Sequence, residues 1–302
     1  NDNVPSVEVD GQSNIVIVGH AASGFPIVGA AFQTVFGGGG VDAFVTKFNP
    51  SGAIQWSTYL GGNAADFNVR SAIDGLDNIV IVGATSSLDF PTLNAFQSTF
   101  GGIGVTRGDL FISKFNTSGL LQWSSYYGGS GGESFAFVAV DKDNDIVIAG
   151  DTYEQSSGSS SNDFPTSGSC IHQSVFGGGR EDNFVTRIST DGLVECSSYL
   201  VGSGNGVVPP NSELLEFYGE MVMGNEVVYL SGYVRTTDFP TTSGAFQESI
   251  GNVSGTGLAD AYLAQICLAT CGAENLSIDF IATDTSLTCN SVISFEDITP
   301  SV

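Results

Sequence analysis

The sequence predicts an all-β protein assembled from tandem sheets of four antiparallel strands. Glycine accounts for 40 of the 302 residues, as expected where many tight turns join short segments. No window shows a sustained helical period with caps, whereas alternating or short β-branched runs are frequent. One pattern of strand-like segments also recurs along most of the chain, and this repetition is the strongest of the three observations.

The recurring pattern is clearest in a segment that reads "VDAFVTKFNPSGAIQWSTYLGG" (41–62), "GDLFISKFNTSGLLQWSSYYGG" (108–129) and "EDNFVTRISTDGLVECSSYLVG" (181–202). A fourth copy starts with "ADAYLAQIC" (259–267). The aspartates at the start of the four copies are separated by 67, 73 and 78 residues: Asp42, Asp109, Asp182 and Asp260. A repeat of this length is long enough to form one supersecondary unit.

Each repeat contains four strand-like runs. In the second repeat they are 67–74, 78–84, 109–116 and 120–127, and "DGLDN" and "NTSG" supply the turn residues of two hairpins. A Phe-Pro pair recurs between the second and third runs, where we expect the phenylalanine to fill an apolar gap. Four antiparallel strands per repeat form the blade of a β-propeller. A solenoid with parallel strands is the rival architecture, but its repeats are shorter and lack hairpin turns.

The repeats resemble SBBP repeats, the β-propeller repeats of bacterial surface proteins. The resemblance rests on "DAFVTKFNPSG", "WSTYLGG", "NIVIVGATSS" and "DFPT…AFQSTFGG". It implies an extracellular, often very long bacterial protein and no defined activity. The third repeat departs from the pattern, because Cys196 replaces the repeated Trp and His172 replaces the Phe of "AFQ".

We therefore expect a propeller domain over 1–272, possessing the following blades: about 7–62, 67–129, 134–202 and 217–268. Residues 273–302 lack the repeat motifs and resemble the start of a PKD-type immunoglobulin-like domain. The rest of that domain does not follow in this sequence. The fourth repeat also lacks a match to "LQWSSYYGG", so we expect further blades from outside this sequence to complete the ring.

Charge excludes two classes of partner. The chain carries 32 acidic and 8 basic residues, for a net charge of −24. Such a surface repels nucleic-acid phosphates and anionic membranes. No segment approaches the roughly 18 apolar residues needed to span a bilayer, so membrane insertion is not expected.

The absence of a metal-binding cysteine pattern and the acidic surface favour an oxidising compartment. The spacing of the five cysteines fits no zinc site, and their number is odd. Cys267 and Cys271 are near enough in sequence to form a disulfide, and Cys170 with Cys196 is a second candidate pair. Cys289 would then pair with a cysteine outside this sequence. These features favour an extracellular or bacterial cell-surface location.

One acidic turn is the candidate metal site. Asp141, Asp143 and Asp145 alternate in "DKDND", and an Asp-x-Asp-x-Asp loop can wrap Ca²⁺ with carboxylate oxygens. The same turn in the other repeats reads "DGQSN", "DGLDN" and "MGNEV", so three acids are not needed to form it. A solvated hairpin without metal is therefore the alternative. Calcium is the one cofactor that the sequence suggests.

The remaining candidate residues have plain structural interpretations. Trp56 and Trp123 recur at one position, which favours packing between blades over sugar stacking. The "RGD" tripeptide ends at Asp109, the repeat's own aspartate. His20 and His172 are the two histidines, and no nucleophile pattern accompanies them.

The sequence therefore predicts a non-catalytic extracellular module for binding or display, similar to an adhesin. Its expected partners are a surface glycan, a protein ligand or other segments of the same long protein. A carbohydrate-binding propeller is one alternative. A propeller hydrolase or lyase is the other, because the plentiful carboxylates leave a paired-acid mechanism open. Catalysis is thus not indicated, although it is not excluded.

Overall fold

The computed structural model describes residues 3–102, 108–154, 162–168, 173–177, 181–200, 221–224, 227–234 and 260–267. Every regular element in this part of the chain is a β-strand. Accordingly, the described residues include no helix with the length and hydropathy to span a membrane. The predicted immunoglobulin-like segment at 273–302 lies outside the described residues.

The first two sheets each contain four strands in chain order, paired antiparallel throughout. The first consists of β1 (Asn3–Val9), β2 (Ile15–Ala21), β3 (Asp42–Phe48) and β4 (Ile54–Leu60). The second consists of β5 (Asp66–Ile73), β6 (Ile79–Thr85), β7 (Asp109–Phe115) and β8 (Leu121–Tyr127). The four strands predicted for the second repeat are confirmed to within a residue at each end.

The third sheet has one strand more than predicted. It contains β9 (Glu133–Val140), β10 (Ile146–Tyr153), β12 (Glu181–Ile188) and β13 (Val194–Leu200), and the short β11 (Ser167–Gly168) pairs with β13 at its outer edge. The fourth sheet shows β14 (Met221–Met223), β15 (Val227–Val234) and β16 (Asp260–Cys267). A fourth strand for this sheet would fall outside the described residues.

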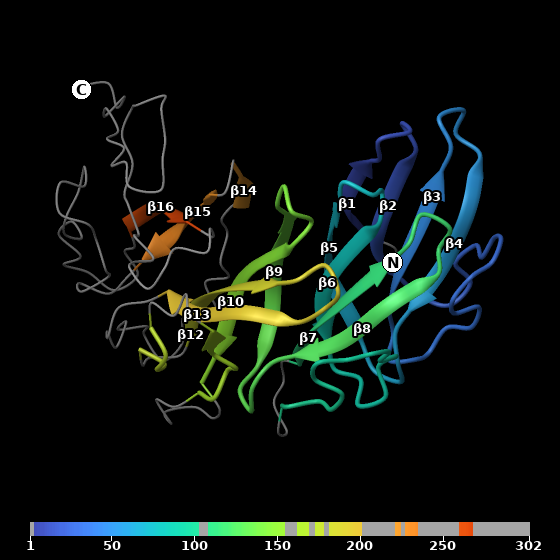
Figure 1. Ribbon diagram of the computed structural model, residues 1–302. Helices are drawn as coiled ribbons and strands as arrows, with labels where there is room; N and C mark the ends of the chain where they lie inside the picture. Colours follow the sequence, from blue (N-terminus) through green and yellow to red (C-terminus); the bar gives the residue numbers. More distant parts are fainter. Residues whose placement is uncertain are drawn as a thin grey trace, which may run out of the picture.

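The sheets pack face against face in chain order, as the blades of a β-propeller do (Figure 1). β5 packs against the first sheet, β9 against the second and β14 against the third. The first strand of each blade therefore makes most of the contacts between the strands of successive blades. The first and fourth sheets stand at opposite ends of this row in Figure 1, so the described strands form an arc and do not show a closed ring.

The apolar core lies between the blades. Alternate residues of a strand point to opposite faces, so Ile79 and Ile81 of β6 pack toward the first blade while Val80 and Val82 pack toward the third. Because both faces of an inner blade are covered, β6 is buried along its whole length. This explains the continuous apolar run "NIVIVGAT", where a sheet with one wet face would alternate.

The long connection between the second and third strands covers the outer edge of each blade. In the first blade Ser57 of β4 donates its backbone N–H to the Val28 carbonyl, and Gln33 pairs with Tyr59. Leu93 and Gln173 pair in the same way with β8 and β13. An uncovered edge strand would be open to pairing with another chain, so this loop protects the edge.

The Phe-Pro pairs anchor these loops as predicted. The rings of Phe25, Phe90 and Phe164 lie 4.1, 4.5 and 4.3 Å, centroid to centroid, from Phe44, Phe111 and Phe184 of the third strands. The aspartates before them reach further than a local turn. Asp89 accepts a hydrogen bond from the Asn63 N–H, and Asp163 accepts one from the Ser130 hydroxyl. They therefore tie each loop to the connection that leads from the preceding blade into its own blade.

Candidate functional site

The two ends of the blades carry different polar groups. We call the end with the tight hairpins, such as β1–β2 and β3–β4, the hairpin end. The opposite end, with the long connections such as β2–β3, is the loop end. The candidate metal residues Asp141, Asp143 and Asp145 lie in the β9–β10 turn at the hairpin end, whereas Asp42, Asp109 and Asp182 lie at the loop end.

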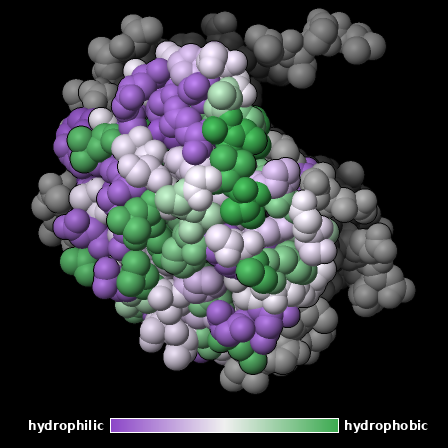
Figure 2. All heavy atoms as spheres, turned by 90° about the vertical axis from the view of Figure 1, so that its right-hand side faces the viewer, coloured by the Kyte–Doolittle hydropathy of each residue, from purple (hydrophilic) through white to green (hydrophobic). Residues whose placement is uncertain are grey.

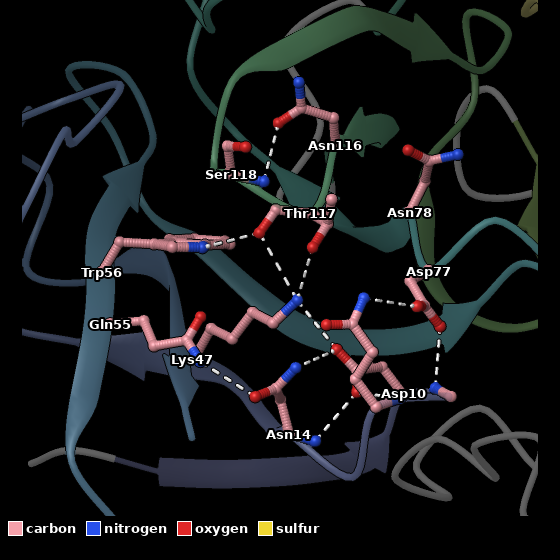
Figure 3. Close-up of polar contacts among 12 residues, drawn as sticks. Asp10, Asn14, Lys47, Gln55, Trp56, Asp77, Asn78, Asn116, Thr117 and Ser118 are labelled. Carbon is pink, nitrogen blue, oxygen red and sulfur yellow. Dashed lines mark hydrogen bonds and ion pairs between the residues drawn. The ribbon is translucent and has the colours of Figure 1, made fainter. Parts of the chain in front are cut away.

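A buried lysine is the centre of the hairpin end (Figure 3). The Lys47 ammonium lies 2.8 Å from Asp10 and donates to the Thr117 hydroxyl at 2.8 Å, so it joins the first blade to the second. In the next pair of blades, Lys114 lies 2.9 Å from Asp74 and donates to the Thr190 hydroxyl at 2.6 Å. At most 3% of any of these four charged side chains is exposed.

The β1–β2 turn positions the carboxylate that receives Lys47. One oxygen of Asp10 accepts the backbone N–H groups of Gln12 and Asn14, and the other accepts the Asn14 side-chain amide. Such an aspartate-centred turn is a local preference of the residue type. Burial tends to raise the pKa of Asp10, but the bonds from Lys47 and Asn14 outweigh it and lower that pKa to about 2. Asp10 therefore stays ionised beside the lysine.

The repeated tryptophans belong to the same network. The indole Nε1 of Trp56 donates to the Thr117 carbonyl at 3.2 Å, and that of Trp123 donates to the Thr190 carbonyl at 3.2 Å. Only 4% of each side chain is exposed. The prediction that these residues pack between blades is confirmed. Since both ring faces are covered by protein, neither indole is open to a sugar.

In the third blade an arginine takes the place of the lysine. One guanidinium nitrogen of Arg187 lies 2.8 Å from both Asp141 and Asp145. Burial raises the pKa of Asp145, and the charge of Arg187 offsets part of this effect. Asp143 points elsewhere and pairs with the exposed Lys142 at 2.7 Å. One terminal guanidinium nitrogen can bond two carboxylates because it carries two N–H donors.

This geometry bears on the candidate calcium site. Two of its three carboxylates come together, but around Arg187, so a calcium ion there would have to displace the guanidinium. Among the described residues, no group of three His, Cys, Asp or Glu side chains is arranged to hold a metal ion. Calcium binding by Asp141, Asp143 and Asp145 thus remains a prediction.

The loop end contains pairs of buried carboxyl groups. A Cβ atom built on Gly61 would lie 2.6 Å from an oxygen of Asp66 and 2.7 Å from the carboxyl carbon of Asp42. The two acids therefore converge on one point. Burial raises the pKa of Asp42 to about 6 and that of Asp66 to about 7. This pair of acids therefore tends to bind a proton at pH values at or just below neutral.

The same arrangement recurs between the second and third blades, where the side chains of Asp109 and Glu133 converge near Gly128. Burial raises the pKa of Asp109 to about 6 and that of Glu133 well above its ordinary value. Glycosidases use a pair of carboxyl groups as their catalytic residues. However, all four acids of the two pairs are fully buried. A polysaccharide therefore has no access to them in this structure.

The repeated aspartates at the start of the third strands also hold the loops. Asp42, Asp109 and Asp182 each accept a backbone N–H from a glycine of the preceding loop, at 2.6, 2.7 and 2.6 Å. Asp109 is the aspartate of the "RGD" tripeptide and is fully buried. It is therefore not presented for adhesion, as the sequence interpretation expected. Arg107 lies outside the described residues.

Among the candidate disulfide cysteines, the side chain of Cys196 is described by the structure. Cys196 is buried at the position of the repeated Trp and forms a disulfide. Its partner is not among the side chains that the structure describes. Cys170, Cys271 and Cys289 lie outside the described residues, and Cys267 is the last residue of β16. The Cys170–Cys196 and Cys267–Cys271 pairings remain predictions.

The basic residues at the hairpin end were missed by the sequence analysis, although a signal was present. Lys47, Lys114 and Arg187 occupy the same position of the repeat, and the whole chain has only eight basic residues. A scarce charged residue that recurs in register inside an apolar strand indicates a fixed partner. Glu133 was harder to find, because the sequence shows aspartate, Asp66, at that position in the preceding blade.

Comparison with known proteins gives distant matches. No family model matches the chain. A segment of 134 residues, 40% of the chain, is 24% identical to an uncharacterized WD repeat-containing protein of Acanthamoeba polyphaga mimivirus, and it covers 9% of that protein. Among solved structures, the endosialidase of phage phi92 matches with a TM-score of 0.42 at 11% identity, over 98% of this chain and 43% of the endosialidase. The chain thus spans less than half of either protein.

Proposed function

We propose that this chain is a non-catalytic binding and display module of an extracellular bacterial surface protein, with an adhesin-like role. The observation that carries the proposal is that the repeated charged and aromatic residues bond one blade to the next. Lys47, Trp56 and their counterparts in the second blade are buried in these contacts. They stiffen a scaffold, and ligand contacts are left to the loops, where acquired function usually lies.

The loop end supplies exposed side chains for such contacts. Leu88 is 73% exposed on the β6–β7 loop. Val35 and Val175, which occupy the same position in the first and third blades, are 72% and 69% exposed. Aliphatic groups suit a protein ligand better than a sugar, which is bound by stacking on exposed aromatic rings. Since both repeated tryptophans are buried, we place a protein ligand ahead of a surface glycan.

Parallel binding and activity measurements test this proposal. The chain is applied to a panel of extracellular proteins and a glycan array, and the same polysaccharides are assayed for cleavage. We expect saturable binding to a protein and no release of products. The double substitution Val35→Asp and Leu88→Asp should weaken binding at least tenfold with an unchanged melting temperature. Leu120→Asp is the matched control, because Leu120 is 66% exposed at the hairpin end.

Two results would oppose the proposal. Product release from any polysaccharide would favour the hydrolase or lyase alternative. Binding confined to glycans and unaffected by the loop substitutions would favour a carbohydrate-binding propeller.

A further inference from the structure

The outer face of the first blade lacks the cover that its counterparts have. Asp10, Asp74 and Asp141 align the three repeats, so Val9 corresponds to Ile73 and Val140. Ile73 and Val140 pack against the preceding blade, whereas Val9 is 63% exposed. Figure 2 views the side of the molecule at the right of Figure 1, and hydrophobic residues gather across the middle of this face.

Neighbouring positions show the same contrast. Val7, two residues before Val9 on β1, is 57% exposed. Ile15 is 36% exposed, while its counterparts Ile79 and Ile146 are fully buried. Ile54 is 38% exposed, while its counterpart Leu121 is 5% exposed. The face is thus built from the residue types that form the blade-to-blade core elsewhere.

The β3–β4 hairpin of this face has a place for an indole ring. Gly52, Gly119 and Gly192 occupy the same turn position, each with φ of 84°. A Cβ on Gly119 would lie 2.8 Å from Trp56, and one on Gly192 would lie 2.9 Å from Trp123, so each glycine supports the tryptophan of the preceding blade. A Cβ on Gly52 would meet no atom within 4 Å.

The polar groups of this hairpin are also in register with the two established interfaces. Pro50 stands where the carbonyl oxygens of Thr117 and Thr190 accept the indole N–H and the lysine, and its own carbonyl oxygen can accept the same donors; proline lacks the hydroxyl that also receives the lysine. Ser13 stands where Asp77 and Asn144 accept a backbone N–H from the preceding blade. Ser13 shares their left-handed conformation, with φ of 63° against 61° and 67°.

We infer that the outer face of the first blade docks another blade of this repeat type, one that carries tryptophan and lysine at the positions of Trp56 and Lys47 and precedes the first blade in chain order. The fourth repeat of this chain does not fit that description. At the same spacing from Asp260 it has Gln265 and Glu274 instead. A second copy of the chain fits poorly as well, because its tryptophans are already buried between its own blades. This inference is independent of the ligand proposed above.

A chain with one added blade tests the inference. A copy of residues 66–131 is fused directly before Asn1, which preserves the spacing between the second and third repeats. We expect the melting temperature to rise, and the added tryptophan to be protected from acrylamide quenching. Trp123→Ala in the added copy should abolish the rise. Gly52→Ala should lower the melting temperature as much as Gly119→Ala in the extended chain, and clearly less in the unextended chain.

A second measurement uses the unextended chain, in case the extended one does not fold. Val9→Asp should leave the melting temperature within about 2 °C and reduce the binding of a hydrophobic dye, whereas Ile73→Asp should unfold the protein. Three results would overturn the inference: equal losses from Val9→Asp and Ile73→Asp, a dimer in sedimentation that Val9→Asp dissociates, or an added blade that leaves Gly52→Ala no more costly than before.

Discussion

At the scale of single residues, the charged groups of the hairpin end depend on one another. A buried ion pair adds little more to the free energy of unfolding than a well-packed apolar pair would. The loss of one partner, however, leaves an uncompensated buried charge. Lys47 and Asp10 are both almost completely buried, and the lysine has a further bond to Thr117. Its removal therefore affects the aspartate turn of its own blade and the contact with the next blade.

We predict that Lys47→Met lowers the free energy of unfolding by about 3–5 kcal/mol, because Asp10 would remain buried without its counter-charge. Adding Asp10→Asn to this variant should restore part of the loss. Urea denaturation followed by tryptophan fluorescence measures both. Lys142→Met is the control, since its ion pair with Asp143 is exposed and should contribute no more than about 1 kcal/mol. Equal losses for the two lysines would contradict the prediction.

At the scale of elements, each blade combines tight hairpins with one long connection that protects an edge. A recurring glutamine helps to hold this connection. The Gln97 side chain donates to the Thr99 carbonyl and to Asp109, and its carbonyl oxygen accepts the Gly128 N–H. One residue thus fixes the loop to the third strand and to the end of β8. The same residue type stands at Gln33 and Gln173.

We predict that Gln97→Ala loosens this loop and exposes the edge of β8. Three hydrogen bonds are lost, each worth about 1 kcal/mol, and the backbone amides of Ser124 and Tyr126 should exchange with deuterium several-fold faster. Hydrogen-exchange mass spectrometry measures this directly. Ser98→Ala, an exposed position of the same loop, should change neither rate. Unchanged exchange in Gln97→Ala would mean that the backbone pairing alone holds the edge.

At the scale of the whole molecule, two sets of acids with opposite pKa shifts determine how stability depends on pH. The first set has lowered pKa values, as at Asp10 and Asp74, where hydrogen bonds and a lysine favour the ionised form over the effect of burial. The second set has pKa values raised by burial, as at Asp42, Asp66 and Asp109. The first set loses its stabilising effect as pH falls below about 4, and the second loses it as pH rises.

We predict greatest stability near pH 4. Asp66, with a pKa near 7, binds a proton in the folded state that the unfolded chain has released above its ordinary pKa, so stability falls between about pH 4 and 7. Each such group contributes a slope of up to about 1.4 kcal/mol per pH unit. Denaturation at pH 5 and pH 8 measures the drop. Asp66→Asn should make it smaller, and an unchanged drop would contradict the assignment.

The sequence by itself determined the strands, the hairpin turns and the repeat. These depend on alternation, turn residues and period, which are local or periodic features of the chain. Hence the strands of the second repeat, the packing role of Trp56 and the anchoring by Phe90 were predicted correctly. Only the tertiary structure decided which distant residues meet. Lys47 and Thr117 lie 70 positions apart, and Asp42 meets Asp66 because the first and second blades pack against each other. The burial that shifts their pKa values is created by that stacking, so no local pattern could reveal it.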